Sequence, residues 1–150
     1  MVVMKKILVE KECEPTFTGA TLLSANEAIT LLTKEERKYK YPWWLRAPSK
    51  GSYLECLVNL YGDIYFKGCL VSYSCDIRPA LIISNLGGFK VGDIFSIREY
   101  DFKIISPTLA WMYFQDIGAD YFDDKSNDYE TSHVKQIIDA WFEKLMDEMI

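Results

Sequence analysis

His133 is the only histidine in this chain of 150 residues, so any catalysis that needs an imidazole base would depend on it. A Ser-His-Asp triad or a Cys-His pair uses histidine to take a proton from the nucleophile. The sequence contains no nucleophile elbow, Cys-x-x-Cys pair, His-Glu-x-x-His motif or phosphate-binding glycine loop. We therefore expect His133 to face solvent or to cap a helix, and we expect no enzyme activity and no catalytic residue.

Four cysteines are the other side chains that could bind a metal or form disulfides. Cys13, Cys56, Cys69 and Cys75 lack the spacing of zinc ligands, since five residues separate Cys69 from Cys75. The chain begins without the pattern of a signal peptide, and no apolar run reaches the roughly 20 residues that a membrane span needs. We expect a cytoplasmic protein with reduced thiols and without a membrane contact, a metal or a cofactor.

Two arginines lie next to prolines, in stretches that should be extended and stiff. Arg46 lies two residues before Pro48, and Arg78 is followed directly by Pro79. The expected role of both guanidinium groups is structural, because they can bind backbone carbonyls or a carboxylate beneath a hairpin. The alternative is a clamp for an anionic ligand, and an enzyme or small-ligand domain would then have its pocket near Arg46 and Arg78.

The negative charge of the chain is concentrated in its second half. Residues 1–75 have a net charge of +2 and residues 76–150 have −7, which together give −5. Direct binding to nucleic acid is not expected of such an acidic protein. A stretch of carboxylates is either a solvated loop or a surface for a basic partner. A calcium-binding loop of the EF type is disfavoured, because Tyr129 stands where such a loop needs glycine. We call this stretch the acidic segment: Asp116, Asp120, Asp123, Asp124, Asp128 and Glu130.

Residues 53–71 predict a β-hairpin whose register can be argued from side-chain chemistry. A turn over residues 59–61, with Gly62 in a bulge, places apolar side chains together on the inner face. The same register places opposite charges across from each other on the outer face. It pairs Val58 with Ile64, Cys56 with Phe66, Glu55 with Lys67 and Leu57 with Tyr65, and it excludes a Cys56–Cys69 disulfide.

The outer face of this hairpin is rich in tyrosine, which offers a large contact area at low cost in conformational entropy. We expect this face to contact a partner unless the last helix or another sheet covers it. The predicted contact residues are Tyr53, Glu55, Leu57, Tyr61, Tyr65, Lys67 and Tyr73, with Cys69 and Ser74 beside them.

The remaining elements are predicted from capping signals and hydrophobic periodicity. Capping boxes at Ser24 and Thr33 indicate a helix over residues 25–32 and one further turn. Strands are expected over residues 7–9, 93–97, 101–105 and 109–114. Apolar residues recur at helical spacing over residues 134–149, and Ser132 or Asp128 is the expected cap. The chain should form a single domain, 1–150, whose halves 1–84 and 89–150 join at a glycine pair.

Two segments carry a resemblance to a known family: residues 43–48, Trp-Trp-Leu-Arg-Ala-Pro, and residues 76–81, Asp-Ile-Arg-Pro-Ala-Leu. They resemble the motifs W-W-L-R-S-P-G and G-V-R-P-A-L of an uncharacterised bacterial and phage domain family. The motif residues that the chain shares, to which we assign a structural role, are Trp43, Trp44, Arg46, Arg78 and Pro79. A third block, residues 92–105, precedes these motifs in larger members of the family and follows them here, so the order of the blocks is permuted.

This family is similar to C-type-lectin-like domains, which share a scaffold with formylglycine-generating-enzyme-like folds. The resemblance implies an α+β fold with a small, mostly antiparallel and twisted sheet, two packed helices and a C-type-lectin-like arrangement. The adjacent Trp43 and Trp44 should point to opposite sides of an extended segment, so that one enters the core and the other a second layer.

The expected function is therefore recognition: a protein-binding module, made by a phage or mobile element, that recognises or inhibits a host protein in the cytosol. Either the tyrosine face of the hairpin docks on the partner, or the acidic segment occupies a basic nucleic-acid-binding groove, as in an inhibitor of the anti-CRISPR type. The alternatives are an enzyme or small-ligand domain with a pocket near Arg46 and Arg78, and a structural or oligomeric component.

Overall fold

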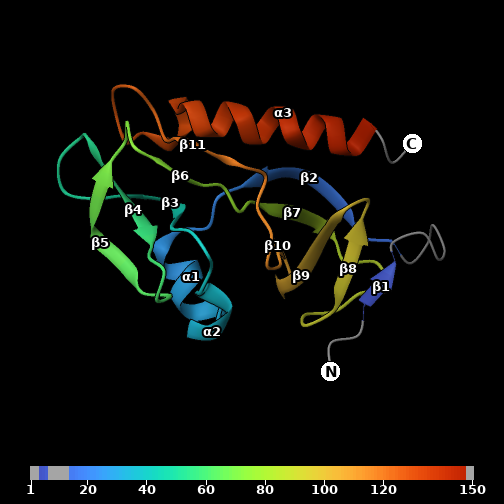
Figure 1. Ribbon diagram of the computed structural model, residues 1–150. Helices are drawn as coiled ribbons and strands as arrows, with labels where there is room; N and C mark the ends of the chain where they lie inside the picture. Colours follow the sequence, from blue (N-terminus) through green and yellow to red (C-terminus); the bar gives the residue numbers. More distant parts are fainter. Residues whose placement is uncertain (1–3, 7–13, 148–150) are drawn as a thin grey trace.

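The computed structural model describes residues 4–6 and 14–147 of the chain. These residues form two β-sheets, two short helices and one long C-terminal helix (Figure 1). The α+β class is confirmed, and two mostly antiparallel sheets take the place of the single sheet that was expected. The strand predicted over residues 7–9 lies outside the described residues.

The two sheets differ in size and share no strand. In spatial order, the first consists of β1 (Met4–Lys6), β8 (Ile94–Ile97), β9 (Tyr100–Ser106), β10 (Leu109–Met112), β7 (Ala80–Asn85) and β2 (Thr16–Thr21). The second consists of β11 (Ala119–Tyr121), β6 (Ser74–Asp76), β3 (Trp43–Pro48), β4 (Leu54–Val58) and β5 (Ile64–Leu70). Among the described strands, only the β1–β8 and β3–β6 pairs are parallel.

The short helices begin where the capping boxes predict them. Ser24 accepts the backbone N–H of Glu27 before α1 (Ala25–Leu31), and the Glu27 carboxylate accepts the backbone N–H of Ser24. Thr33 and Glu36 make the same reciprocal pair before α2 (Lys34–Arg37). Each cap satisfies N–H groups that the first helical turn leaves unpaired, which contributes about 1 kcal/mol.

The C-terminal helix α3 (His133–Asp147) lies along both sheets at the top of Figure 1. Its buried residues are Val134, Ile138 and Leu145, which confirms the predicted apolar stripe over the described residues. Ser132 accepts the backbone N–H of Lys135 and caps α3, while Asp128 caps the preceding 3₁₀ helix η2 (Tyr129–Thr131). No helix among the described residues is long and apolar enough to cross a membrane.

The adjacent tryptophans of β3 enter two different hydrophobic cores, as predicted. Trp44 belongs to the first core, which includes Phe102 and Phe122 and which α3 covers. Trp43 belongs to the second core, together with Trp111 and with residues of α1. Both indole rings are fully buried, so β3 contributes one tryptophan side chain to each of the two cores.

The predicted halves of the chain are interleaved in space. β7 comes from the first half and lies between β10 and β2, while β11 comes from the second half and pairs with β6. The expected linker is a turn, in which Phe89 donates its backbone N–H to Leu86. The strand predicted over residues 109–114 ends at Met112, because Phe114 adopts a left-handed conformation (φ +55°) that a strand cannot continue through.

Candidate functional site

The β4–β5 hairpin turns in the way the sequence predicts. Gly62 donates its N–H to the carbonyl of Asn59, and the Asn59 side chain accepts the N–H groups of Tyr61 and Asp63. Gly62 has φ +83°, and a Cβ atom there would lie 2.6 Å from the Lys34 carbonyl, so only glycine fits. The predicted pairs Val58–Ile64 and Leu57–Tyr65 are confirmed.

The predicted register is wrong beyond Tyr65. Three residues of β5, 66–68, lie opposite Cys56 alone, and Gly68 adopts φ +77° within this bulge. Glu55 consequently lies opposite Cys69, and the expected Glu55–Lys67 pair does not form. The shift also exposes Phe66, which was assigned to the inner face and is 59% exposed.

Glu55 and Leu57 are buried and do not belong to the outer surface as predicted. Glu55 is fully buried, and neither carboxylate oxygen has a hydrogen-bond partner among the described residues. Burial raises the pKa of this carboxyl to about 9. Glu55 is therefore protonated at neutral pH, and it adds no negative charge to the hairpin.

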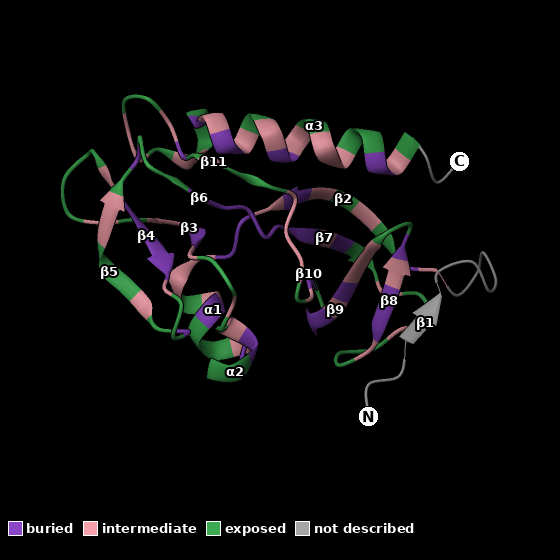
Figure 2. Ribbon diagram, in the orientation of Figure 1, coloured by how far each residue is buried: buried purple, intermediate pink, exposed green. Residues whose placement is uncertain are grey.

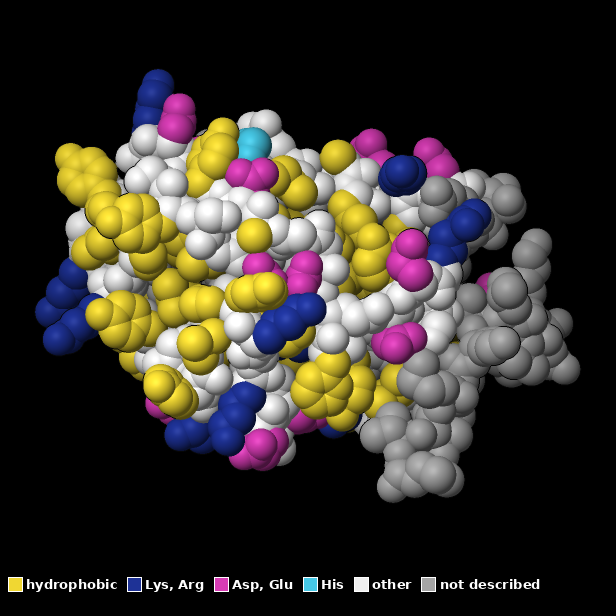
Figure 3. Space-filling model, in the orientation of Figure 1, with side chains coloured by type: hydrophobic (Ala, Val, Ile, Leu, Met, Phe, Trp, Pro, Cys, Tyr) yellow, Lys and Arg dark blue, Asp and Glu magenta, His cyan; other side chains and the backbone are white. Residues whose placement is uncertain are grey.

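The tyrosines of the hairpin are exposed, as the sequence predicts, and no described sheet or helix covers them. Figure 2 shows β5 exposed over much of its length beside the buried β4, and Figure 3 shows hydrophobic side chains gathered at this end of the molecule. Three further apolar residues join them. We define the hairpin surface as Tyr53, Leu60, Tyr61, Tyr65, Phe66, Leu70 and Tyr73, whose exposed fractions run from 42% to 71%.

Two hollows flank the strand β5. The first, of about 460 Å³, has walls that include Leu57, Tyr65, Cys69 and Tyr73. The second, of about 350 Å³, is lined by Ser49, Lys50, Leu54, Phe66 and Lys67. Consecutive residues of a strand point to opposite faces, so Tyr65 and Phe66 place these hollows on the two sides of β5.

The acidic segment is mostly engaged in shaping its own loop. Asp116 accepts the hydroxyl of Tyr39, and Asp123 accepts the backbone N–H groups of Ser126 and His133. Asp128 accepts the N–H of Glu130, and Asp120 accepts the N–H of Tyr121. These carboxylates satisfy local N–H and O–H donors, so part of their hydrogen-bonding capacity is used within the loop.

His133 lies at the first residue of α3, where its ring stacks on Tyr121 with centroids 4.1 Å apart. Its Nε2 atom is 3.3 Å from the Asp120 carboxylate, within ion-pair distance but without hydrogen-bond geometry. The thiols of Cys69 and Cys75 influence each other's ionisation, and burial raises the pKa of Cys75 to about 12. Neither group is arranged as an activated nucleophile and base.

The two arginines have the structural role that the sequence predicts. Arg46 donates to the Leu22 carbonyl and forms an ion pair of 2.8 Å with Glu27, which braces the start of α1. Arg78 is fully buried and donates to the Gln115 carbonyl at 3.1 Å. Its guanidinium carbon lies 4.2 Å from the ring centroids of Tyr39 and Trp111 and 4.9 Å from that of Trp43. No sequence motif predicts this aromatic cage.

A hollow of about 510 Å³ beside Arg78 contains a carboxylate pair that the sequence analysis also missed. Asp76 hydrogen-bonds to Asp116 there, next to Lys40 and Cys75. Burial, followed by the hydrogen bond and charge of Asp116, raises the pKa of Asp76 to about 7. Burial also opposes ionisation of Asp116, but hydrogen bonds from Tyr39 and from the Gly118 N–H outweigh it and keep this pKa below its usual range. The pair can hold one proton between its two carboxylates, and the neighbouring Cys75 thiol is not activated, because burial raises its pKa to about 12.

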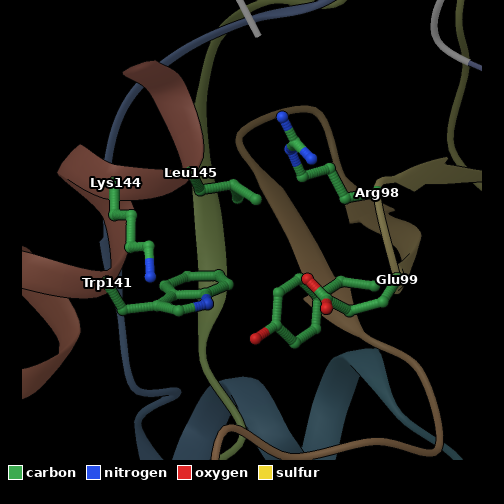
Figure 4. Close-up of a pocket in the computed structure, with 6 residues that line it drawn as sticks. Arg98, Glu99, Trp141, Lys144 and Leu145 are labelled. Carbon is green, nitrogen blue, oxygen red and sulfur yellow. The ribbon is translucent and has the colours of Figure 1, made fainter. Parts of the chain in front are cut away.

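Another hollow, of about 450 Å³, lies between the β8–β9 turn and α3 (Figure 4). Trp141 and Tyr100 both line it and meet edge to face, with centroids 5.6 Å apart. Its charged side chains Arg98, Glu99 and Lys144 have both signs and are exposed. Its charged groups are thus exposed, and the polar atom that is buried without a partner among the described residues is the Trp141 Nε1, which is not the set of converging groups of a catalytic site.

Comparison of the chain with protein-family models, with curated proteins and with solved structures found no match. The family resemblance and the C-type-lectin-like arrangement thus remain predictions from the sequence motifs. The geometry favours the hairpin surface as the candidate functional site, since it is exposed, apolar and held on a buried strand.

Proposed function

We propose that this chain is a non-enzymatic protein-binding module and that the hairpin surface is its contact. The observation that carries this proposal is the exposure of seven large apolar side chains on one hairpin. Leaving apolar area in water costs about 25 cal/mol per Å², and large exposed apolar areas on soluble domains mark interaction sites. Tyrosine and other aromatic residues are also frequent among the side chains that dominate binding energy.

The support beneath this surface suits it to binding. β4 is buried between β3 and β5, and its Leu57 and Val58 pack in the two cores. The turn at Gly62 rests against α2, where Arg37 donates to the Gly62 carbonyl at 2.7 Å. A surface that is rigid before binding loses little conformational entropy on binding, which favours affinity.

The partner that we propose is a host protein, bound in the cytosol by an accessory protein of a phage or mobile element. The resemblance to phage domains and the absence of an activated catalytic group among the described residues support this class of function. The acidic segment is a weaker contact for an inhibitor of the anti-CRISPR type. Asp116, Asp120 and Asp123 already bind groups of their own chain.

The proposal is tested by affinity capture from host extract, with quantitative mass spectrometry. The wild type is compared with Tyr61→Ser/Tyr65→Ser, which alters the hairpin surface, and with Tyr41→Ser, which alters an exposed tyrosine elsewhere. We expect a protein that wild type and Tyr41→Ser retain and that the double variant loses. Equal capture by all three would contradict the proposal. Loss only in Asp124→Asn/Glu130→Gln would instead identify the acidic segment as the contact.

A further inference from the structure

We propose that an extended, acidic segment of the partner pairs with the open edge of β5 and extends the second sheet by one strand. This inference rests on the proposed function and specifies how the hairpin surface is used. β5 is the last strand of its sheet, and β4 is its only partner among the described strands. An edge strand of seven residues presents N–H and C=O groups that a second chain can pair with.

The backbone of β5 shows where the added strand would pair. The backbone N–H of Asn59 bonds to the Asp63 carbonyl, so alternation directs the backbone groups of Tyr65 toward β4 and those of Ile64 away from it. Beyond Phe66 the bulge with Gly68 interrupts regular pairing. The N–H and C=O of Ile64 are therefore the groups of this edge that are available for a new ladder, since the Phe66 carbonyl already accepts the Ser49 hydroxyl.

The hollows on the two sides of β5 supply the side-chain selectivity. An added strand directs alternate side chains to opposite faces of the sheet. One face would place an apolar side chain beside Tyr65 and Leu70 in the first hollow. The other face would place its neighbour beside Lys50 and Lys67 in the second hollow.

The charges around this edge determine the chemistry of the partner segment. Lys50 and Lys67 are exposed, Glu55 is protonated, and Asp63 is paired with Lys34 at 3.0 Å. The edge is thus locally positive on a chain whose net charge is −5. A segment in which apolar residues alternate with aspartate or glutamate complements it. A second copy of β5 does not, because it would bring another Lys67 to the same edge.

The test uses two short capped peptides, one that alternates valine with glutamate and one that alternates valine with lysine. We expect the wild type to bind the glutamate peptide about tenfold more tightly, and Lys50→Glu/Lys67→Glu to reverse this preference. Lys125→Glu lies outside the hairpin and is the matched control, which should behave as the wild type. On binding, hydrogen exchange at the Ile64 amide should slow, which reports the new backbone pairing.

Four outcomes would overturn this inference. Equal binding of both peptides to all variants would show that charge does not select the partner segment. An unchanged hydrogen-exchange rate at the Ile64 amide would show that no strand pairs with this edge. Self-association of the wild type that Lys67→Glu strengthens would identify a second copy as the occupant. If neither peptide binds while capture of a host protein still depends on Tyr61 and Tyr65, strand pairing is wrong and the proposed function still holds.

Discussion

Glu55 brings a carboxyl group into the interior of the second sheet without a partner for either oxygen among the described residues. Its pKa rises from 4.5 to about 9 on folding because burial disfavours the ionised form. The folded protein therefore keeps a proton that the unfolded chain releases, and stability falls as the pH rises from about 4.5 to about 9. At neutral pH this difference amounts to roughly 3 kcal/mol against the folded state.

We predict that Glu55→Gln raises the free energy of unfolding at neutral pH by about 1–3 kcal/mol. Glutamine has nearly the shape of the protonated acid and no ionised form, so the decline in stability toward higher pH should become shallower. Denaturant unfolding over a pH series measures both effects. Glu35→Gln, which changes an exposed carboxylate, is the control. A Glu55→Gln protein with lower stability and an unchanged pH slope would show that this carboxyl is not the group responsible.

At the scale of elements, the bulge in β5 determines which side chains reach the surface. Gly68 allows this bulge because glycine adopts a left-handed φ without strain and because its backbone can approach β4 closely. A Cβ atom at this position would lie 2.9 Å from the Glu55 carbonyl and 2.8 Å from the Ser49 Cβ. The bulge in turn moves Lys67 away from Glu55 and turns Phe66 outward, so the composition of the hairpin surface depends on one glycine.

We predict that Gly68→Ala lowers the free energy of unfolding by about 2–4 kcal/mol, since it combines backbone strain with steric overlap. Gly92→Ala is the matched control: Gly92 has φ +98° but nothing within 4 Å of its would-be Cβ. Strain alone should cost about 1 kcal/mol there. The free energy of unfolding is measured by denaturant unfolding. If the two variants lose the same amount, the close contact of Gly68 with β4 does not contribute to the effect of the substitution.

The elements that the sequence predicts are those fixed by neighbouring residues. The caps at Ser24 and Thr33 and the turn at Gly62 depend on contacts within a few positions, and the stripe of α3 is visible as a spacing of apolar residues within one helix. The register past Tyr65 depends instead on two extra residues in β5. The alternation of apolar and charged residues in this segment favours a regular ladder. This pattern does not indicate that Gly68 takes the left-handed conformation.

Parts of the candidate site also depend on contacts between distant residues. The cage around Arg78 joins Tyr39, Trp43 and Trp111, and nothing local links these positions. The partner of Asp76 lies 40 positions along the chain, in the acidic segment. Sequence reasoning identified Arg78 as structural and Asp116 as acidic, but it could not place them in one neighbourhood.

At the scale of the whole molecule, the Asp76–Asp116 pair connects three separate parts of the chain. Asp76 ends β6, Asp116 precedes β11, and Tyr39 from the loop after α2 donates its hydroxyl to Asp116. The pKa of Asp76 rises on folding from 3.8 to about 7. The folded state thus holds a proton over this range, and its stability falls as the pH rises from about 3.8 to about 7.

We predict that the Asp76 carboxyl titrates near 7 in the wild type, as followed by carbon NMR of its side chain. Asp116→Asn removes the ionised neighbour, so the pKa of Asp76 should move down toward its ordinary value. Asp139→Asn changes a surface carboxylate on α3 that pairs with Lys135, and this control should leave the pKa of Asp76 unchanged. Titration of Asp76 near 3.8 in the wild type would show that the two carboxylates do not share a proton.

The two ends of the described chain lie far from the hairpin. β1 and the C-terminal end of α3 are at the right of Figure 1, and β5 is at the left. A tag or a fused fluorescent protein at either end would thus be attached on the side of the molecule opposite the tyrosines. Anchoring the protein to a sensor chip through such a tag should leave the hairpin facing the flowing sample, so both fusion orientations are suitable for kinetic measurements.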